Sequence, residues 1–329
     1  MGDLTDWNHV VSSGTAAPPH YGEPRHEFTA LRTSAAVSPL THFALLRFHG
    51  RDANAFLQGQ LTCDLDKLTD AHARFGGYCT PKGRLLASFL IWSTPQAYLM
   101  LLPADIAPGV AERLRKFVLR SQVKIEHARD LHMLGLAGTA AVAVLQQELG
   151  VSPQGRLEIS THARTTVLRL PGEHFLLVAT AEDMPALWRS LAKRALPVGT
   201  QCWSAVQIQA GVPWISAPTQ DQFLPQMIGL DDIGGVSFDK GCYTGQEIVA
   251  RTHYLGEVKR KLRLGRTLGV VSPGDILSSA EMACGMVLNA ASIPGEGSTL
   301  LAVVSEPGDA VQTTSGERVE WSPLPPVVG

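Results

Sequence analysis

The residue best suited to chemistry in this sequence is Cys242, which lies between Lys240 and a stretch with helical character. Thr244 and Glu247 stand in the relation of a capping box, so we expect a helix to begin there, with the thiol just ahead of it. The partial positive charge at a helix N-terminus favours the thiolate, which is the reactive form of cysteine. We therefore predict a reactive thiol at Cys242, supported by the cations of Lys240 and Arg251.

Other interpretations of this segment stay open. A free cysteine often packs as a small, inert apolar residue, so Cys242 could instead be buried in a strand-to-helix turn. We expect the strand of that turn at residues 234–238, where a glycine pair leads into a short apolar run. His253 could form a thiol–imidazole pair with Cys242, although a histidine after a short helix is more often exposed to solvent.

Three stretches of the chain resemble a known family. Residues 240–247 read K-G-C-Y-T-G-Q-E, which is similar to the signature of the YgfZ-type folate-binding proteins, relatives of the glycine cleavage T-protein (aminomethyltransferase) family. Residues 50–64, and residues 210–213 with 223–226, carry the rest of the resemblance. It implies a protein that binds tetrahydrofolate and supports the assembly or repair of iron–sulfur clusters in client enzymes, with Cys242 at the rim of the folate cleft. It does not imply that this chain carries a cluster.

The resemblance also implies candidate residues for folate binding. In T-proteins a glutamate before the Ala-Gly segment pairs with the pterin ring, and Gln209, with one carbonyl acceptor, stands at that place here. Four polar residues after the first helix, Gln58, Gln60, Thr62 and Asp64, can line the cleft, or serve as capping and turn residues. The predicted folate-binding residues are therefore Gln58, Gln60, Asp64, Gln209, Tyr243, Gln246 and Glu247, and the predicted cofactor is tetrahydrofolate or a one-carbon derivative.

T-proteins place a carboxylate in a loop of the first unit, where it acts on the folate nitrogen that accepts the one-carbon group. The comparable loop here, residues 80–86, contains Lys82 and Arg84 but no acid. Two cations cannot replace a carboxylate, which argues against aminomethyl transfer by that route. A folate-dependent aminomethyltransferase or demethylating enzyme is the alternative to the accessory protein.

The composition is that of an ordinary globular protein. Of the 329 residues, 45% are hydrophobic and 18% are charged, with a formal net charge of -2, which excludes global disorder and a basic overall surface. The five cysteines are dispersed without a C-x-x-C pair, so we expect no disulfide framework, no metal site and a reducing cytoplasm. The apolar runs are too short to span a bilayer and no signal peptide is evident, so we expect no membrane partner.

A basic stretch follows the cysteine segment. Between Arg251 and Arg266 six basic residues stand against one acid, Glu257. Such a stretch can attract the glutamyl tail of a folate, an acidic protein or an RNA backbone, or it can be a solvated face. The partners that we expect are a reduced folate and iron–sulfur client enzymes or assembly factors, and we expect no DNA partner.

Hydrophobic patterns predict two α+β units of similar order. In the first we expect strands at 44–48, 74–79, 85–92, 98–102 and 123–125, with helices after Asp52 and Asp105; the buried face of the second helix would include Val110, Leu114 and Phe117. In the second we expect strands at 132–137, 166–170, 175–179 and 205–209, a helix between Thr139 and Gly150, and another after Asp183. The predicted fold class is α+β, with two ferredoxin-like βαββαβ units forming a T-protein-like folate-binding body.

The pattern of apolar residues changes beyond Tyr254. Short apolar runs separated by glycine, proline and serine predict a small C-terminal β-barrel. The expected organisation is a flexible N-terminal tail at residues 1–27, a first unit at 28–126, a second unit at 127–254 with the Cys242 motif, and the barrel at 255–329. We expect the ligand site between the two α+β units.

Overall fold

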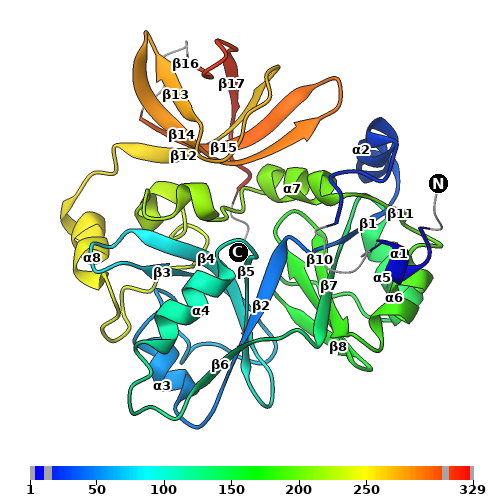
Figure 1. The fold of residues 1–329 in the computed structure, drawn as a ribbon, viewed down its shortest axis with the longest axis horizontal. Coiled ribbons are helices and arrows are strands. Elements are labelled where there is room, and N and C mark those ends of the chain that lie inside the picture. Colours follow the sequence, from blue (N-terminus) through cyan, green and yellow to red (C-terminus); the bar gives the residue numbers. More distant parts are fainter. Residues whose placement is uncertain (1–3, 11–16, 306–310, 327–329) are drawn as a thin grey trace.

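The computed structural model describes residues 4–10, 17–305 and 311–326. In these ranges three sheets form three units around a common centre (Figure 1). The first unit lies at the lower left of that view, the second at the right, and the C-terminal sheet above both. No helix of the described ranges is long and apolar enough to cross a bilayer.

The first sheet has five antiparallel strands in the order β3-β4-β5-β2-β6. Strand β4 is a nearly unbroken apolar run because both of its faces are buried. Helix α4 buries Val110 and Leu114 but ends at Arg115, so Phe117, expected on the same face, is 44% exposed. The elements, in the expected order, are β2 (Phe43–His49), α3 (Ala53–Gln58), β3 (Arg74–Cys79), β4 (Leu85–Ser93), β5 (Tyr98–Pro103), α4 (Ala107–Arg115) and β6 (Lys124–His127).

The second sheet has the order β11-β1-β7-β10-β9-β8. Its run β8-β9-β10-β7 repeats the run β3-β4-β5-β2 of the first sheet, so the predicted pair of similar α+β units is confirmed. Strand β1 lies within residues 28–126, where the first unit is expected, yet it pairs with β7 of the second sheet, with Ala36 opposite Ala137. The elements are β1 (Ala36–Pro39), β7 (Leu131–Ala137), α5 (Ala141–Leu149), β8 (Ile159–His162), β9 (Thr165–Leu170), β10 (His174–Thr180), α6 (Met184–Leu191) and β11 (Leu196–Pro197).

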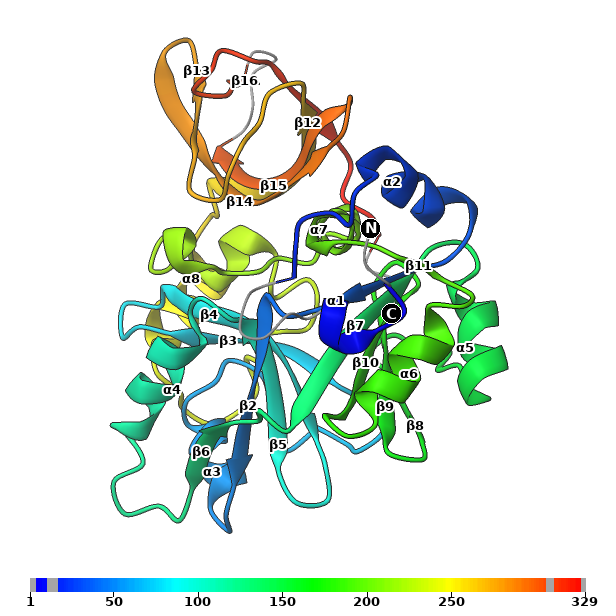
Figure 2. The same ribbon diagram turned by 45° about the vertical axis from the view of Figure 1, so that its right-hand side comes forward.

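The predicted strand at residues 205–209 is wrong, because these residues end helix α7 (Thr200–Gln209). The helix packs against β1 and β7 on one side and against the C-terminal strands β14 and β15 on the other (Figures 1 and 2). Since Cys202, Trp203 and Gln207 are all buried, the helix lacks the single apolar stripe from which a helix is predicted.

The C-terminal sheet is antiparallel, with the order β16-β13-β14-β15-β12-β17, and curls into a half-barrel (Figure 2). Its own core contains Leu277, Val287 and Leu300, whereas Leu262 and Leu264 of β12 belong to the core shared with the body. The predicted barrel is therefore confirmed as a half-barrel. The strands are β12 (Arg260–Thr267), β13 (Ile276–Ser279), β14 (Met282–Ile293), β15 (Gly297–Ser305), β16 (Val311–Gln312) and β17 (Val319–Ser322).

The described part of the N-terminal segment packs against the second unit, although the prediction for residues 1–27 is a flexible tail. It forms helices α1 (Trp7–Val10) and α2 (Pro24–Thr33). Trp7 is buried beside Trp188 of α6, with 5.7 Å between ring centroids, and the Trp188 indole N–H donates to the carbonyl of Leu4 at 2.9 Å. Residues 1–3 and 11–16 of the predicted tail lie outside the described residues.

One of the two predicted end signals of helix α5 is wrong. Gly150 ends the helix in the left-handed conformation, with φ of 65°, as expected. Thr139 does not cap the start, because Ala140 is the N-cap residue and the Thr139 hydroxyl donates instead to the carbonyl of Ser34 at 3.4 Å.

Candidate functional site

A cavity of about 420 Å³ lies where the three units meet. Its walls come from the start of β2, the turn after β5, helix α7, the loop that follows α7, and strand β14 of the half-barrel. Phe43, Trp203 and Trp214 give it aromatic walls. Small-molecule sites are usually mostly apolar cavities at such junctions, with a few polar groups that fix the ligand. We call this space the central cavity.

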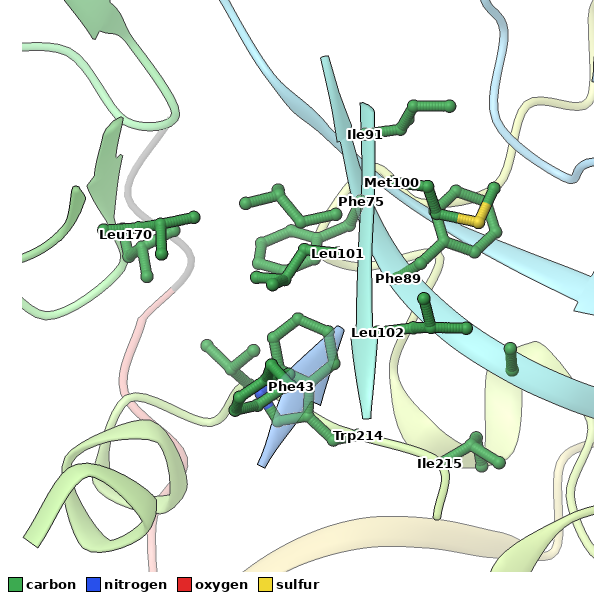
Figure 3. Packing of buried hydrophobic residues seen from close by; sticks show 14 of the residues in the cluster. Phe43, Phe75, Phe89, Ile91, Met100, Leu101, Leu102, Leu170, Trp214 and Ile215 are labelled. Atoms are coloured by element: carbon green, nitrogen blue, oxygen red, sulfur yellow. The ribbon is translucent and has the colours of Figure 1, made fainter. Parts of the chain in front are cut away.

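The aromatic walls of the central cavity are held rigidly. Phe43 and Trp214 meet edge to face, with 4.9 Å between ring centroids and 69° between planes (Figure 3). Phe75 supports Trp214 at 6.3 Å. Trp203 packs over Gly135 of β7, where a β-carbon would lie 2.2 Å from Cε3 of the indole. Fixed aromatic rings of this kind can stack on a flat heterocycle without much loss of side-chain entropy.

A hydrogen-bonded chain fixes the polar groups behind these rings. The Trp214 indole N–H donates to Oε1 of Gln207 at 3.2 Å, and the Gln207 amide nitrogen lies 2.5 Å from Nε2 of His174. Burial lowers the pKa of His174 to about 4, so the imidazole is neutral at pH 7 and accepts the amide proton. Asn289 of β14 clamps the backbone of Trp214, accepting from its N–H at 3.0 Å and donating to its carbonyl at 2.8 Å. The cavity wall is thus preorganised by all three units.

His42 borders the central cavity, and both of its ring nitrogens are buried in the wall. Neither ring nitrogen has a hydrogen-bond partner in the described part of the chain, and both are shielded from solvent. Burial lowers its pKa to about 4, so the ring is neutral and provides one donor and one acceptor. Buried polar atoms without partners are rare in native proteins, and a ligand in the cavity would reach these two only after the His42 side chain turned toward it. Asp105 also borders the cavity, where its carboxylate accepts from the N–H of Ala217 at 2.8 Å.

A second cavity, of about 460 Å³, shares Val212 with the central cavity. Arg156 and Arg169 line it, and Nε of Arg156 is buried without a partner in the described residues. Arg169 is paired with Glu173 at 2.9 Å, and Asp232 adds a further negative charge to the wall. Because these charges largely balance, this cavity is a weaker candidate for an anionic ligand.

The segment around Cys242 is irregular and exposed. The predicted strand at residues 234–238 is wrong, since only Ser237 of that run makes a ladder-like bond, donating its N–H to the carbonyl of Thr62 at 2.9 Å. The predicted capping box is also wrong, because helix α8 (Gln246–Leu255) starts after Gly245 and has no side-chain cap. Gly245 has φ of 85° and its backbone approaches the carbonyl of Thr80 so closely that any side chain would collide there. The thiol of Cys242 is exposed, which excludes its interpretation as a buried residue.

Lys240 anchors this segment to the first unit. Its Nζ atom donates to the carbonyl oxygens of Leu61 at 2.8 Å and Cys63 at 2.7 Å, and lies 5.4 Å from the ring centroid of Tyr243. Partial burial lowers the pKa of the ammonium group. The described contacts of Lys240 are therefore with the loop after α3, and its predicted effect on Cys242 stays a prediction.

Comparison with known proteins identifies the family. A family model described as the GCVT N-terminal domain matches residues 9–240. The tRNA-modifying protein YgfZ of Colwellia psychrerythraea is 33% identical over 226 residues, which cover 68% of this chain and 69% of that protein. The protein of the same name from Klebsiella pneumoniae is 33% identical over 241 residues, covering 73% and 74% of the two chains. The chain belongs to the YgfZ family.

The fold of this YgfZ-family chain is that of a T-protein. Its structure is similar to the aminomethyltransferase T of the glycine cleavage system from Bartonella henselae, with a TM-score of 0.77, 17% sequence identity, and coverage of 95% of this chain and 91% of that one. Both the predicted family resemblance and the predicted T-protein-like fold are confirmed.

The structure does not bring the predicted site residues of this YgfZ-family protein to the central cavity. Gln209 is exposed and its amide donates to the hydroxyl of Thr299 on the half-barrel at 2.8 Å. Gln58 donates to Asp64 at 2.8 Å and accepts from the N–H of Leu65 at 2.8 Å, which matches the alternative interpretation of a turn network. None of the described residues that line the central cavity belongs to the predicted set Gln58, Gln60, Asp64, Gln209, Lys240, Cys242, Tyr243, Gln246, Glu247 and Arg251.

The environments of the remaining predicted residues are local. Burial raises the pKa of Asp64, but hydrogen bonds from Gln58 and from the N–H of Asp66 lower it by more, so the net effect is a lowered pKa. Tyr243 is buried, and its hydroxyl has no partner in the described residues. Glu247 and Arg251 lie exposed on α8, and Gln60 and Gln246 are half-buried.

Sequence reasoning missed the aromatic residues that form the YgfZ cavity. Trp214 directly follows Ala210–Pro213, which carried part of the family resemblance, so its position was a usable signal. Trp203 and Gln207 lie four residues apart on α7 and share a face of the helix. The sequence analysis predicted a strand at residues 205–209, so this shared face was not recognised. Phe43 begins β2 and reads as an ordinary core residue.

Proposed function

We propose that this YgfZ-family protein binds a reduced folate, with the flat pterin ring in the central cavity. The observation that carries the proposal is the set of rigid aromatic walls, Phe43, Trp203 and Trp214, beside the unpartnered ring nitrogens of His42. Stacking on these walls supplies affinity, and the donor and acceptor of His42 select a ligand with a polar heterocyclic edge. A bound tetrahydrofolate would supply a carrier for one-carbon groups.

The chain's own residues would hold and dehydrate the ring. Asn289 and Gln207 fix Trp214 from two sides, so the ring would enter a preformed slot. Neutral His174 keeps Gln207 in one orientation, because its Nε2 accepts the amide proton. The half-barrel would close the site, since β14 contributes Asn289 to the wall.

We further propose that the protein serves as an accessory factor for iron–sulfur enzymes in the cytoplasm, through the exposed thiol of Cys242. The exposed sulfur in an irregular segment can reach a second macromolecule, whereas the central cavity lies elsewhere in the fold. Curated relatives carry the name tRNA-modifying protein, so we propose client enzymes that modify tRNA and need their clusters assembled or repaired. In this proposal folate binding and the thiol are two separate functional regions of one protein.

An aminomethyltransferase or demethylating enzyme is the second candidate, and one observation favours it. The carboxylate of Asp105 borders the central cavity, so an acid is available there although the loop at residues 80–86 has none. A D105N variant separates the two candidates. Turnover of an aminomethyl or methylamine donor by the wild type, and its loss in D105N, would support the enzyme; folate binding without turnover would support the accessory protein.

Calorimetric titration with tetrahydrofolate tests the binding proposal. We expect saturable binding of one folate per chain, and absence of saturation would overturn the proposal. For the accessory role, complementation of a deletion strain by the wild type and by C242S is the test. Loss of complementation in C242S with unchanged folate affinity is expected, whereas full rescue would make the thiol dispensable.

A further inference from the structure

Two metal-ligating side chains of the N-terminal segment lie close to a third from helix α7. The three are His20, which precedes α2, Glu27 on α2, and Cys202 in the first turn of α7. One ligand atom from each, the imidazole nitrogen, a carboxylate oxygen and the sulfur, all lie within 4.8 Å of one another. Cys202 is fully buried and Glu27 is 3% exposed, so the cluster lies inside the protein.

The carboxylate of Glu27 is held in a fixed orientation. Oε1 accepts from the N–H of Tyr21 at 2.6 Å, and Oε2 accepts from the N–H of Gly199 at 2.8 Å. These bonds use only part of the acceptor capacity of a carboxylate, which has about four lone-pair sites. Ligating carboxylates in metal sites are themselves hydrogen-bonded in this way, because outer partners orient the ligand.

The other two groups of the cluster are an imidazole and a thiol. Nδ1 of His20 is shielded from solvent and has no hydrogen-bond partner in the described residues, since Oε2 of Glu27 lies 3.6 Å away. The sulfur of Cys202 is fully buried and belongs to the same cluster. A buried carboxylate beside an unpartnered nitrogen and a thiol is a costly arrangement unless a cation joins them.

We infer that His20, Glu27 and Cys202 form a binding site for a divalent metal ion of the zinc class. Imidazole, carboxylate and thiolate are the three ligand types that zinc takes, at about 2.0–2.3 Å each, and three protein ligands leave a fourth position for water. In a tetrahedral site these bond lengths place ligand atoms about 3.5 Å apart. Nδ1 of His20 and Oε2 of Glu27 are already 3.6 Å apart, so the contraction of about 1 Å that the cluster needs concerns mainly their distances to the sulfur of Cys202. Binding would release the thiol proton of Cys202 to solvent and leave a metal-bound thiolate.

The competing interpretation is that Glu27 acts alone as a clamp. Its bonds to Tyr21 and Gly199 already tie the N-terminal segment to the start of α7. The clamp, together with an ion pair between Glu27 and His20 at 3.6 Å, explains the carboxylate and the nitrogen but not the sulfur that lies beside them. A metal ion would explain all three groups. It would also fix the start of α7, where Trp203 forms a wall of the central cavity.

Titration with zinc chloride and cobalt chloride tests the inference. We expect one ion per chain, a rise in melting temperature with zinc, and a sulfur-to-cobalt charge-transfer band with tetrahedral ligand-field absorption. C202S should abolish the charge-transfer band, and H20N should weaken zinc binding by at least about 10-fold. C63S is the matched control, because Cys63 is equally buried but lies outside the cluster.

The outcomes separate a metal site from a clamp. Absence of stoichiometric metal binding, or a charge-transfer band that persists in C202S, would overturn the inference. H20N keeps both hydrogen bonds of Glu27, so it should fold like the wild type in the absence of metal. If H20N loses metal binding but keeps the wild-type melting temperature without metal, the metal site is supported. The result is independent of folate binding, which uses other residues.

Discussion

Trp203 occupies the space that a side chain at Gly135 would need: a β-carbon built on Gly135 would lie 2.2 Å from Cε3 of the indole. The pair joins strand β7 to helix α7 and sets the position of one wall of the central cavity. Glycine is therefore required at position 135 because the indole lies so close to its backbone. It is not required by the backbone conformation, since Gly135 does not have a positive φ.

The G135A variant should displace the indole. We expect a loss of about 1–3 kcal/mol in the free energy of unfolding, because a methyl group is forced into a filled core, and a weaker affinity for tetrahydrofolate. Denaturant titration and calorimetry measure the two effects. G109A is the control: nothing lies within 4 Å of its added β-carbon, and alanine in helix α4 should stabilise by about 0.5–1 kcal/mol. Equal effects of the two variants would contradict the argument.

Replacing Phe43 by leucine should remove an aromatic face while keeping an apolar side chain. Because stacking of a flat ring on an aromatic side chain contributes about 1–3 kcal/mol, F43L should weaken tetrahydrofolate binding by about 10-fold or more. Calorimetric titration gives the affinity. Y254A, at an exposed aromatic residue outside the cavity, should bind as the wild type does; a wild-type affinity in F43L would place the ring elsewhere.

Protonation of His174 should destabilise the protein in mild acid. Its pKa is about 4 in the folded chain and 6.5 in the unfolded chain, so between these values the unfolded state binds more protons. The stability is complete above pH 6.5 and falls as the pH is lowered toward 4, by about 3 kcal/mol in total. Unfolding by denaturant at several pH values measures this slope.

An H174Q variant tests the assignment of that slope. H174Q should flatten the pH dependence of the free energy of unfolding between pH 6.5 and 4. His42, whose pKa is also lowered to about 4, should account for part of the remaining slope. H162Q, at an exposed position, should keep the slope. An unchanged slope in H174Q would show that His174 is not the titrating group.

Cys242 should react first when the native protein is alkylated. Its thiol is exposed, whereas Cys63, Cys79 and Cys202 are buried, and burial raises the pKa of Cys63 to about 11 and of Cys79 to about 12. Peptide mapping after a short treatment with iodoacetamide should find the label at Cys242, and C242S should remove the fast phase. Alkylation in denaturant, which reaches all cysteines, is the control; a faster reaction at any other cysteine would refute the prediction.

A K240M variant separates anchoring from tuning of the thiol. Loss of the ammonium leaves the carbonyls of Leu61 and Cys63 without their donor, which should cost about 1–3 kcal/mol in the free energy of unfolding. If Lys240 only anchors the segment, Cys242 should be alkylated at the wild-type rate in the folded variant. A slower rate would show that the cation also promotes the thiolate, as we predicted from the sequence.

Local signals in the sequence were sufficient for most elements and for the family. Strand β3 has the predicted bounds, and the repeated order of strands and helices in the two units follows from apolar periodicity, which depends on neighbours in the chain. The K-G-C-Y-T-G-Q-E string identified the family for the same reason, since it is contiguous. Helix α7 was not predicted, because a helix with contacts on both sides does not show a single apolar stripe.

The sites depend on tertiary structure. Phe43, Trp203 and Trp214 meet only because β2, α7 and the following loop belong to units that pack together, and Asn289 joins them from a strand of the half-barrel. His20, Glu27 and Cys202 likewise carry no spacing that predicts a metal ion, because their proximity arises when α2 packs beside the start of α7. The sequence alone determined the fold class, the family and the motif around Cys242. The packing of distant segments decided where a flat ligand or a metal ion can bind, because such sites are made of contacts between residues far apart in the chain.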